Sequence, residues 1–182
     1  MEKSKKLVVM LGSPNPNSVS EKVAMEFVKG AEEAGYTAKI YNIDNLNVKG
    51  CKGCGSCRKN DIDCVIDDDL KAYFKDLHSC DALLVTAPNY YSQIAGPMIT
   101  FMNRHYCLNR ADKTSRLESG KKLAGIFAQG APEDYPKYPA TYDWYLGTFA
   151  SKGMENVGKI IIGGNSDLEK KCREAYELGK SL

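Results

Sequence analysis

Five short apolar segments alternate with segments of helical periodicity along this chain of 182 residues. The first segment spans Lys6 to Leu11, is apolar from Leu7 onward, and is followed by Gly12. Such a continuous apolar run is typical of a strand buried on both faces. The expected strands span 6–11, 38–43, 81–87, 122–128 and 157–162, and the expected helices span 18–34, 67–78, 97–108, 140–152 and 166–182. This alternation predicts a doubly wound α/β fold, in which helices cover both faces of a five-stranded parallel sheet in three layers.

A sheet of this kind concentrates ligands at one edge. Because parallel strands end on the same side, the loops that follow them meet beyond their carboxyl ends, near the point where the strand order reverses. The loops after Leu11, Ala87 and Ala128 are therefore the candidate ligand-binding segments.

The loop of residues 12–20 reads Gly-Ser-Pro-Asn-Pro-Asn-Ser-Val-Ser and leads directly into a helix. Hydroxyl groups and backbone N–H groups at a helix N-terminus favour an anion, so we expect a phosphate group here. The alternative is an ordinary helix-capping turn rich in Ser, Asn and Pro. The loop has neither the G-x-G-x-x-G pattern of dinucleotide-binding folds nor the G-x-x-x-x-G-K-[ST] pattern of nucleoside triphosphatases.

The other two loops carry aromatic and amide side chains. Residues 88–93 read Pro-Asn-Tyr-Tyr-Ser-Gln, which suits stacking on a flat ring and hydrogen bonding to its polar edge. Residues 129–135 begin with Gln129 and Gly130 and could complete the same pocket. Alternatively, the tyrosines cover the end of the sheet or contact another subunit.

A cluster of four cysteines lies between the second and third expected strands. Cys51, Cys54, Cys57 and Cys64 follow the spacing C-x2-C-x2-C-x6-C, and overlapping C-x2-C steps are typical of a cubane iron–sulfur cluster. A zinc site more often uses two C-x2-C pairs with a long spacer between them. Reduced thiols without a metal remain the alternative. The aspartates at 67–69 follow, and we interpret them as the solvated start of a helix.

The composition excludes several classes of protein. A net charge of +2 with both signs interspersed provides no basic face for nucleic acid. The apolar run after the charged N-terminus is too short for a signal peptide or a membrane span. Seven cysteines without an export signal indicate the cytoplasm, where thiols stay reduced. We therefore expect a single cytoplasmic domain over residues 1–182, with neither a membrane nor a nucleic-acid partner.

Several segments together resemble the flavodoxin-like NADPH-dependent FMN reductase family. They are Gly12-Ser13-Pro14, the cysteine cluster with its following aspartates, residues 87–91 (Ala-Pro-Asn-Tyr-Tyr), and the spaced Gly96, Phe101 and Arg104. The segment 51–69 is most similar to the iron–sulfur flavoprotein branch of that family. The resemblance implies a flavodoxin-like sheet in the order 2-1-3-4-5, bound FMN, NAD(P)H as electron donor, and assembly into homodimers or homotetramers.

By the same resemblance, two groups of residues would hold FMN. Those at its phosphate are Ser13, Asn15, Ser18, Val19 and Ser20. Those at its isoalloxazine ring are Pro88, Asn89, Tyr90, Tyr91, Gln129 and Gly130. The sequence departs from the family pattern at Asn15, where arginine is usual, and at Val19, where asparagine is usual. The loop therefore lacks one charge and one amide contact to the phosphate.

A bound flavin would carry the chemistry itself. This agrees with the absence of a Ser-His-Asp arrangement from the sequence. We interpret the two histidines, His78 and His105, as structural. The first hypothesis is an NAD(P)H-dependent FMN oxidoreductase that reduces a small acceptor such as a quinone, free flavin, an azo or a nitro compound. The second is an electron carrier with a [4Fe–4S] cluster on the cysteine loop and a ferredoxin-like partner. The third is a non-enzymatic thiol or metal redox sensor, for which Arg58 and Lys59 would lower the pKa of Cys57.

Overall fold

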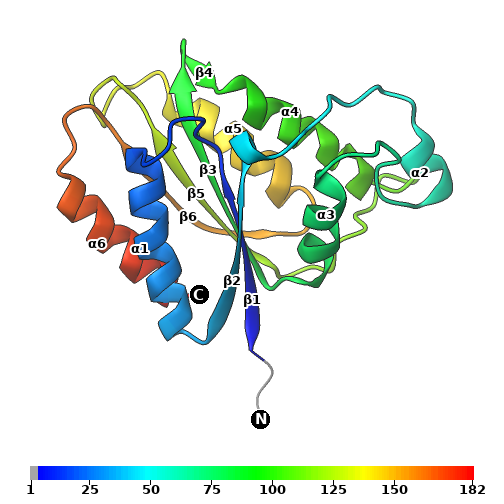
Figure 1. Ribbon diagram of the computed structural model, residues 1–182, viewed down its shortest axis with the longest axis horizontal. Coiled ribbons are helices and arrows are strands. Elements are labelled where there is room, and N and C mark those ends of the chain that lie inside the picture. Colours follow the sequence, from blue (N-terminus) through cyan, green and yellow to red (C-terminus); the bar gives the residue numbers. More distant parts are fainter. Residues whose placement is uncertain (1–3) are drawn as a thin grey trace.

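The computed structural model describes residues 4–182 and shows a parallel sheet between two layers of helices (Figure 1). Its parallel strands are β1 (Lys5–Leu11), β2 (Tyr36–Asn42), β3 (Ala82–Tyr90), β5 (Lys122–Ala128) and β6 (Glu155–Ile162). They lie in the order β2-β1-β3-β5-β6, and the short β4 (Gln93–Ile94) pairs antiparallel with β3. Without β4 this is the order 2-1-3-4-5, so the prediction of a flavodoxin-like α/β fold is confirmed.

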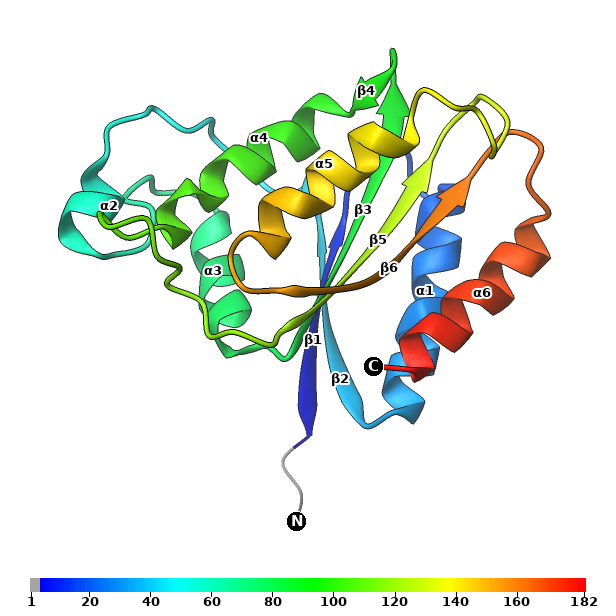
Figure 2. The same ribbon diagram turned by 180° about the vertical axis from the view of Figure 1, so that it is seen from behind.

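Helices cover both faces of the sheet (Figure 2). α1 (Val19–Glu33) and α6 (Leu168–Lys180) pack on one face, over Leu7, Val9 and Leu11 of β1. α3 (Leu70–Ser79), α4 (Gly96–Arg104) and α5 (Pro139–Ala150) cover the other face, over Val8 and Met10. Successive side chains of β1 alternate between the two faces and are buried on both, which accounts for the uninterrupted apolar run in the sequence. No helix within residues 4–182 is long and apolar enough to cross a lipid bilayer.

Several element boundaries differ from the sequence-based prediction. The sequence predicts an end of the third strand at Pro88, but β3 continues to Tyr90 because its last two residues pair with β4. The helix predicted from residue 67 begins at Leu70. α4 ends at Arg104 and continues as the 3-10 helix η2 (His105–Leu108). The short elements η1 (Ile43–Asn45) and α2 (Ser56–Asn60) are not predicted, because three and five residues carry too little periodicity.

His105 is enclosed in an aromatic cluster beneath the helices. The rings of Tyr73 and Phe101 lie edge-on to the imidazole, with centroids at 5.4 and 4.6 Å. Its Nδ1 is 2.9 Å from the Phe101 carbonyl oxygen and its Nε2 is 2.8 Å from the Tyr73 hydroxyl, so a neutral ring can donate at Nδ1 and accept at Nε2. Burial, reinforced by the charges of Arg104 and Lys152, lowers the pKa of His105 to about 4. This environment agrees with the structural role predicted for His105.

We predict that acid weakens the fold through this residue. The unfolded chain binds a proton at His105 near pH 6.5, whereas the folded chain resists it until about pH 4. The stabilisation is therefore complete above pH 6.5 and is lost as the pH falls to 4, by about 3 kcal/mol in total. His105→Gln cannot take up this proton, so its free energy of unfolding, measured by urea titration, should decline less over that interval. Parallel declines in the two proteins would contradict the prediction.

Candidate functional site

The loops after β1 and β3 are held together at their bases. The Gly12 N–H donates a 2.9 Å hydrogen bond to the Thr86 hydroxyl, which places the start of the first loop against β3. A Cβ atom at Gly12 would lie 2.1 Å from the Thr86 carbonyl oxygen, so this close approach requires glycine. Because β5 is the next strand in the sheet, all three predicted loops lie along one carboxyl edge.

The first loop presents hydroxyl groups at the N-terminus of α1. Ser18 caps the helix, since its Oγ accepts a 3.2 Å hydrogen bond from the Glu21 N–H. The hydroxyl groups of Ser18 and Ser20 lie 3.1 Å apart. The side chain of Val19 is exposed, but it is apolar and cannot bind an anion. The backbone N–H of Val19 is the group that could do so. The capping turn and the predicted anion site are the same structure.

Ser13 and Asn15 form the earlier part of this loop. Ser13 is buried, and its Oγ accepts a 3.2 Å hydrogen bond from the Asn15 N–H. Residues 12–20 include no lysine or arginine, so neutral hydroxyl and N–H donors and the helix dipole would bind a phosphate. This donor set fits a phosphate group, although it lacks the charge-assisted contact of an arginine.

A chain of hydrogen bonds joins the second and third loops. The Asn89 Nδ2 donates to the Tyr142 hydroxyl at 3.1 Å, and that hydroxyl donates to the Gln129 Oε1 at 2.7 Å. The Gln129 Nε2 donates in turn to the Pro132 carbonyl oxygen at 2.6 Å. The chain fixes the amides of Asn89 and Gln129 at the sheet edge, and Gly130 follows, exposed, next to Gln129.

Tyr142 is a residue of this site that the sequence analysis missed. It is fully buried and stacks on Phe127, with 4.4 Å between ring centroids and 7° between ring planes. Its neighbour Tyr145 is equally buried, but the Tyr145 hydroxyl donates to the Met98 carbonyl oxygen instead. Nothing in the local sequence distinguishes the two tyrosines, because only the approach of distant loops gives Tyr142 its partners.

The hairpin between β3 and β4 projects from the sheet, at the top of Figure 1. Pro88 at its base is buried, whereas Tyr90 is half exposed and Tyr91 fully exposed. Tyr91 and Ser92 form the turn, with φ angles of 52° and 66°, a left-handed conformation that costs a non-glycine residue of order 1 kcal/mol. Two aromatic rings are thus presented to solvent beside the amides of the second loop.

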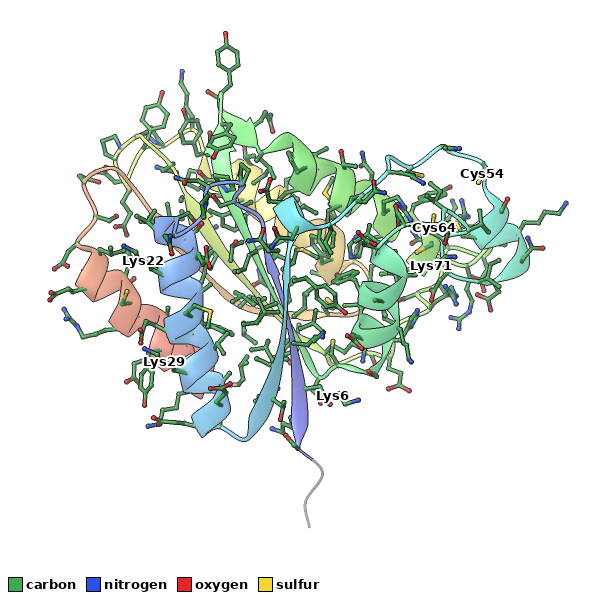
Figure 3. The ribbon with its side chains drawn as sticks, viewed as in Figure 1. Lys6, Lys22, Lys29, Cys54, Cys64 and Lys71 are labelled. Atoms are coloured by element: carbon green, nitrogen blue, oxygen red, sulfur yellow. The ribbon has the colours of Figure 1, made fainter. Side chains whose placement is uncertain are left out.

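The four cysteines line one hollow beside α2, away from the hairpin. Figure 3 shows Cys54 and Cys64 on the same side of the molecule. Cys57 is buried, Cys64 is half-buried, and Cys51 and Cys54 are exposed. Within residues 4–182 no three His, Cys, Asp or Glu side chains converge closely enough for a single metal ion. In a cubane cluster the thiolates bind different iron atoms, so four cysteines that line one hollow provide the donor set that such a cluster needs.

The prediction of a lowered pKa at Cys57 is wrong. Burial raises the pKa of the Cys57 thiol. The Arg58 guanidinium binds other groups, because it donates to the Tyr106 hydroxyl at 2.6 Å and to two backbone carbonyls. Hydrogen bonds from Ser56 lower the pKa of Cys54 instead. The observation that favoured a thiol sensor is therefore not present at Cys57.

The prediction that the aspartates at 67–69 are all solvated is also wrong for one of them. The Asp68 side chain is fully buried in an ion pair with Arg104, whose side chain is only 1% exposed. Asp67 is exposed beside Lys71, as predicted. Arg104 belongs to α4 and reaches Asp68 from a distant part of the chain, which the local charge pattern cannot reveal.

The ion pair connects both ends of the cysteine loop. The Arg104 Nη1 donates to the Lys49 carbonyl oxygen at 2.8 Å, and Asp68 accepts from the N–H groups of Lys49 at 3.0 Å and Leu70 at 3.2 Å. Although burial opposes its charged form, the hydrogen bonds to Asp68 raise the pKa of Arg104, and the nearby Cys64 sulfur adds to this effect. The guanidinium therefore remains charged next to one of the predicted cluster ligands.

A second arginine holds the outer part of this loop. Arg116 pairs with Asp61 at 3.1 Å and with Asp63 at 2.7 Å, and its Nη1 also donates to the Cys107 carbonyl oxygen. Its side chain is 15% exposed. The cysteine loop is thus anchored to the rest of the fold at both its inner and its outer end.

Comparison with known proteins establishes the class. The sequence profile of the NADPH-dependent FMN reductase family matches residues 5–133, and the chain belongs to this family. It is an oxidoreductase that uses FMN and NAD(P)H. It is 28% identical over 162 residues to an iron-sulfur flavoprotein of Methanosarcina thermophila, covering 88% of this chain and 78% of that protein. It is 29% identical over 183 residues to an iron-sulfur flavoprotein of Archaeoglobus fulgidus, covering 94% and 80%.

Solved structures share the fold. The NAD(P)H:quinone oxidoreductase from Methanothermobacter marburgensis superposes with a TM-score of 0.78 at 17% identity, over 99% of this chain and 98% of that chain. An FMN-dependent NADH-azoreductase from Bacillus anthracis str. Ames Ancestor, in complex with FMN, superposes with a TM-score of 0.65 at 16% identity, over 97% of each chain. At these identities the likeness concerns the fold.

We predict that a negative charge at the cap of α1 expels the flavin. Ser18→Asp preserves the cap, because aspartate caps helices as well as serine, but it would place a carboxylate against a phosphate bound at this cap. FMN affinity, measured by quenching of flavin fluorescence, should fall at least roughly tenfold, since like charges a few ångströms apart repel by more than 1.4 kcal/mol. Ser18→Asn, a neutral cap, serves as the control and should retain FMN. Equal affinities of the two variants would contradict the phosphate assignment.

Proposed function

We propose that this protein is an FMN-dependent NAD(P)H oxidoreductase that also carries a [4Fe–4S] cluster on Cys51, Cys54, Cys57 and Cys64. It would deliver electrons to a small acceptor or to a ferredoxin-like partner. The observation that carries the proposal is that four cysteines of suitable spacing line one hollow in a chain that belongs to an FMN reductase family. The names of the curated relatives, iron-sulfur flavoproteins, support the same assignment.

The sheet edge would hold FMN. Its phosphate would lie at Ser13, Asn15, Ser18, Val19 and Ser20, and its ring at Pro88, Asn89, Tyr90, Tyr91, Gln129 and Gly130. When bound, FMN supplies hydride and single-electron chemistry. The residues of this chain bind and orient it: the cap of α1 binds the phosphate, and the Asn89–Tyr142–Gln129 chain holds two amides in place for the polar edge of the ring. The exposed tyrosines offer a stacking surface that would exclude water.

The cysteine loop would hold the second centre. A bound [4Fe–4S] cluster supplies one-electron transfer at a potential that the surrounding hydrogen bonds set. The chain contributes the sulfur ligands and a loop already anchored by Arg104 and Arg116. A reductase without a cluster is the competing function, and the same sheet edge would support it.

The test is an assay of iron, sulfide and FMN on one anaerobically prepared sample. We expect about one FMN and about four iron atoms with matching sulfide per chain, because a cubane cluster contains four of each. FMN without iron or sulfide would reject the cluster and leave the cluster-free reductase. Iron and sulfide without FMN would reject the assignment of the sheet edge.

We predict that Cys54→Ser loses the cluster and keeps the flavin. The Cys54 side chain is exposed, so its replacement does not disturb the core, and FMN would bind elsewhere at the sheet edge. Iron content should fall by at least half, with an unchanged FMN content. Cys172→Ser, at a partly buried thiol on α6 outside the loop, is the matched control and should retain its iron. Equal iron in both variants would exclude Cys54 as a ligand.

We further propose that copies of this chain associate through the β3–β4 hairpin as homodimers or homotetramers. Tyr91 is fully exposed and Trp144, on α5, is half exposed, and exposed aromatic rings are typical of interfaces. The Ser92 Oγ lies 3.3 Å from the Tyr138 hydroxyl, which connects the hairpin to α5.

Light scattering tests this assembly. Tyr91→Ser should reduce the average mass of the protein in solution, since it removes the most exposed aromatic ring of the hairpin. Ile40→Thr, at an exposed position on the edge strand β2, is the control and should keep the mass of the unsubstituted protein. An unchanged mass for Tyr91→Ser would remove the hairpin from the interface.

A further inference from the structure

Arg104 is an exception among the buried polar side chains. Its Nε is the one buried side-chain nitrogen or oxygen within residues 4–182 that has no hydrogen-bond partner. Each of the other two guanidinium nitrogens has a partner, because Nη1 and Nη2 donate to Asp68 and Nη1 also donates to the Lys49 carbonyl oxygen. A buried N–H without an acceptor is costly, so the one buried nitrogen that has no partner marks a place where an acceptor belongs.

The Cys64 sulfur is the neighbouring group that can fill this gap. The Cys64 sulfur is close enough to the Arg104 guanidinium to raise its pKa, although it makes no hydrogen bond to Nε. Cys64 also lines the hollow that it shares with the other three cysteines. A neutral thiol is a weak acceptor. A metal-bound thiolate carries negative charge and accepts strongly from a cationic donor. A ligand thiolate at Cys64 would therefore supply the acceptor that Nε lacks.

Asp68 determines the orientation of the guanidinium. Its two carboxylate oxygens accept from Nη1 and Nη2 of Arg104 and from the N–H groups of Lys49 and Leu70. Backbone hydrogen bonds thus fix the position of the Asp68 carboxylate. The carboxylate in turn fixes the edge of the Arg104 guanidinium formed by Nη1 and Nη2. The pair also joins Lys49, two residues before Cys51, to Asp68, four residues after Cys64.

We propose that Arg104 is a positioning residue for the metal centre: held by Asp68, it donates its Nε–H to the Cys64 sulfur when this sulfur is a cluster ligand. This inference rests on the proposed [4Fe–4S] cluster. A hydrogen bond to a ligand sulfur stabilises the more negative, reduced state of the cluster, so it raises the reduction potential. The same bond slows dissociation of Cys64 from iron.

The test replaces Arg104 with lysine in the anaerobic holoprotein. Arg104→Lys keeps a positive charge opposite Asp68 but cannot bind Asp68 with two nitrogens and donate to Cys64 with a third. We expect iron loss to a chelator about tenfold faster than in the unsubstituted protein, because a charge-assisted hydrogen bond is lost. The midpoint potential of the cluster should become more negative, while the FMN content and the midpoint potential of FMN remain unchanged.

Arg116→Lys is the matched control. Arg116 is also largely buried and also anchors the cysteine loop, but its partners are two carboxylates and a backbone carbonyl. We expect its cluster potential to equal that of the unsubstituted protein. If both variants shift the potential equally, or if neither does, the specific role of Arg104 is overturned.

A measurement on the unsubstituted protein covers the case in which Arg104→Lys does not fold. Pulsed electron paramagnetic resonance of the reduced cluster, with arginine labelled with ¹⁵N, should detect a coupled arginine nitrogen. Its absence would overturn the inference while leaving the cluster in place. An unsubstituted protein without iron or sulfide would overturn the cluster and the inference together, so the two failures are distinguishable.

Discussion

The residues of β1 from Leu7 to Leu11 are all buried, and neighbouring side chains belong to opposite helical layers. Because both faces of the sheet are occupied by helices, the connections between parallel strands must cross those faces, and the edges are left for loops. The carboxyl edge therefore collects the capping turn of α1, the tyrosine hairpin and the Gln129 loop. The requirement to cover both faces thus determines where a flavin could lie.

The cysteine loop is positioned by different forces. It belongs to the connection between β2 and β3, where the chain runs from Leu46 to Asp69 with only the five-residue α2 as regular structure. A long irregular segment is costly to order unless other groups hold it. Ion pairs hold this one: Arg104 with Asp68 at the inner end, and Arg116 with Asp61 and Asp63 at the outer end.

The two sites consequently differ in how far local sequence predicts them. The anion site proposed at the first loop would use the backbone and hydroxyl groups of that loop at a helix terminus, so residues 12–20 predict it directly. The spacing of the cysteines likewise predicts competence for a cluster. The error at Cys57 has a physical cause, because burial outweighs the two neighbouring cations when Arg58 turns toward Tyr106. The error at Asp68 has a different physical cause, because its partner, Arg104, is 36 residues away in the sequence.

The sequence by itself determined the α/β class, the alternation of its strands and helices, the three loops of the sheet edge and the four cysteines. These features depend on periodicity, capping and spacing, which are local properties of the chain. Only the tertiary structure revealed Tyr142 as the link between Asn89 and Gln129, the burial of Asp68, and the unpaired Nε of Arg104 beside Cys64. Each of these depends on groups far apart in the chain that meet in a water-excluded interior, where an unmatched polar atom becomes costly.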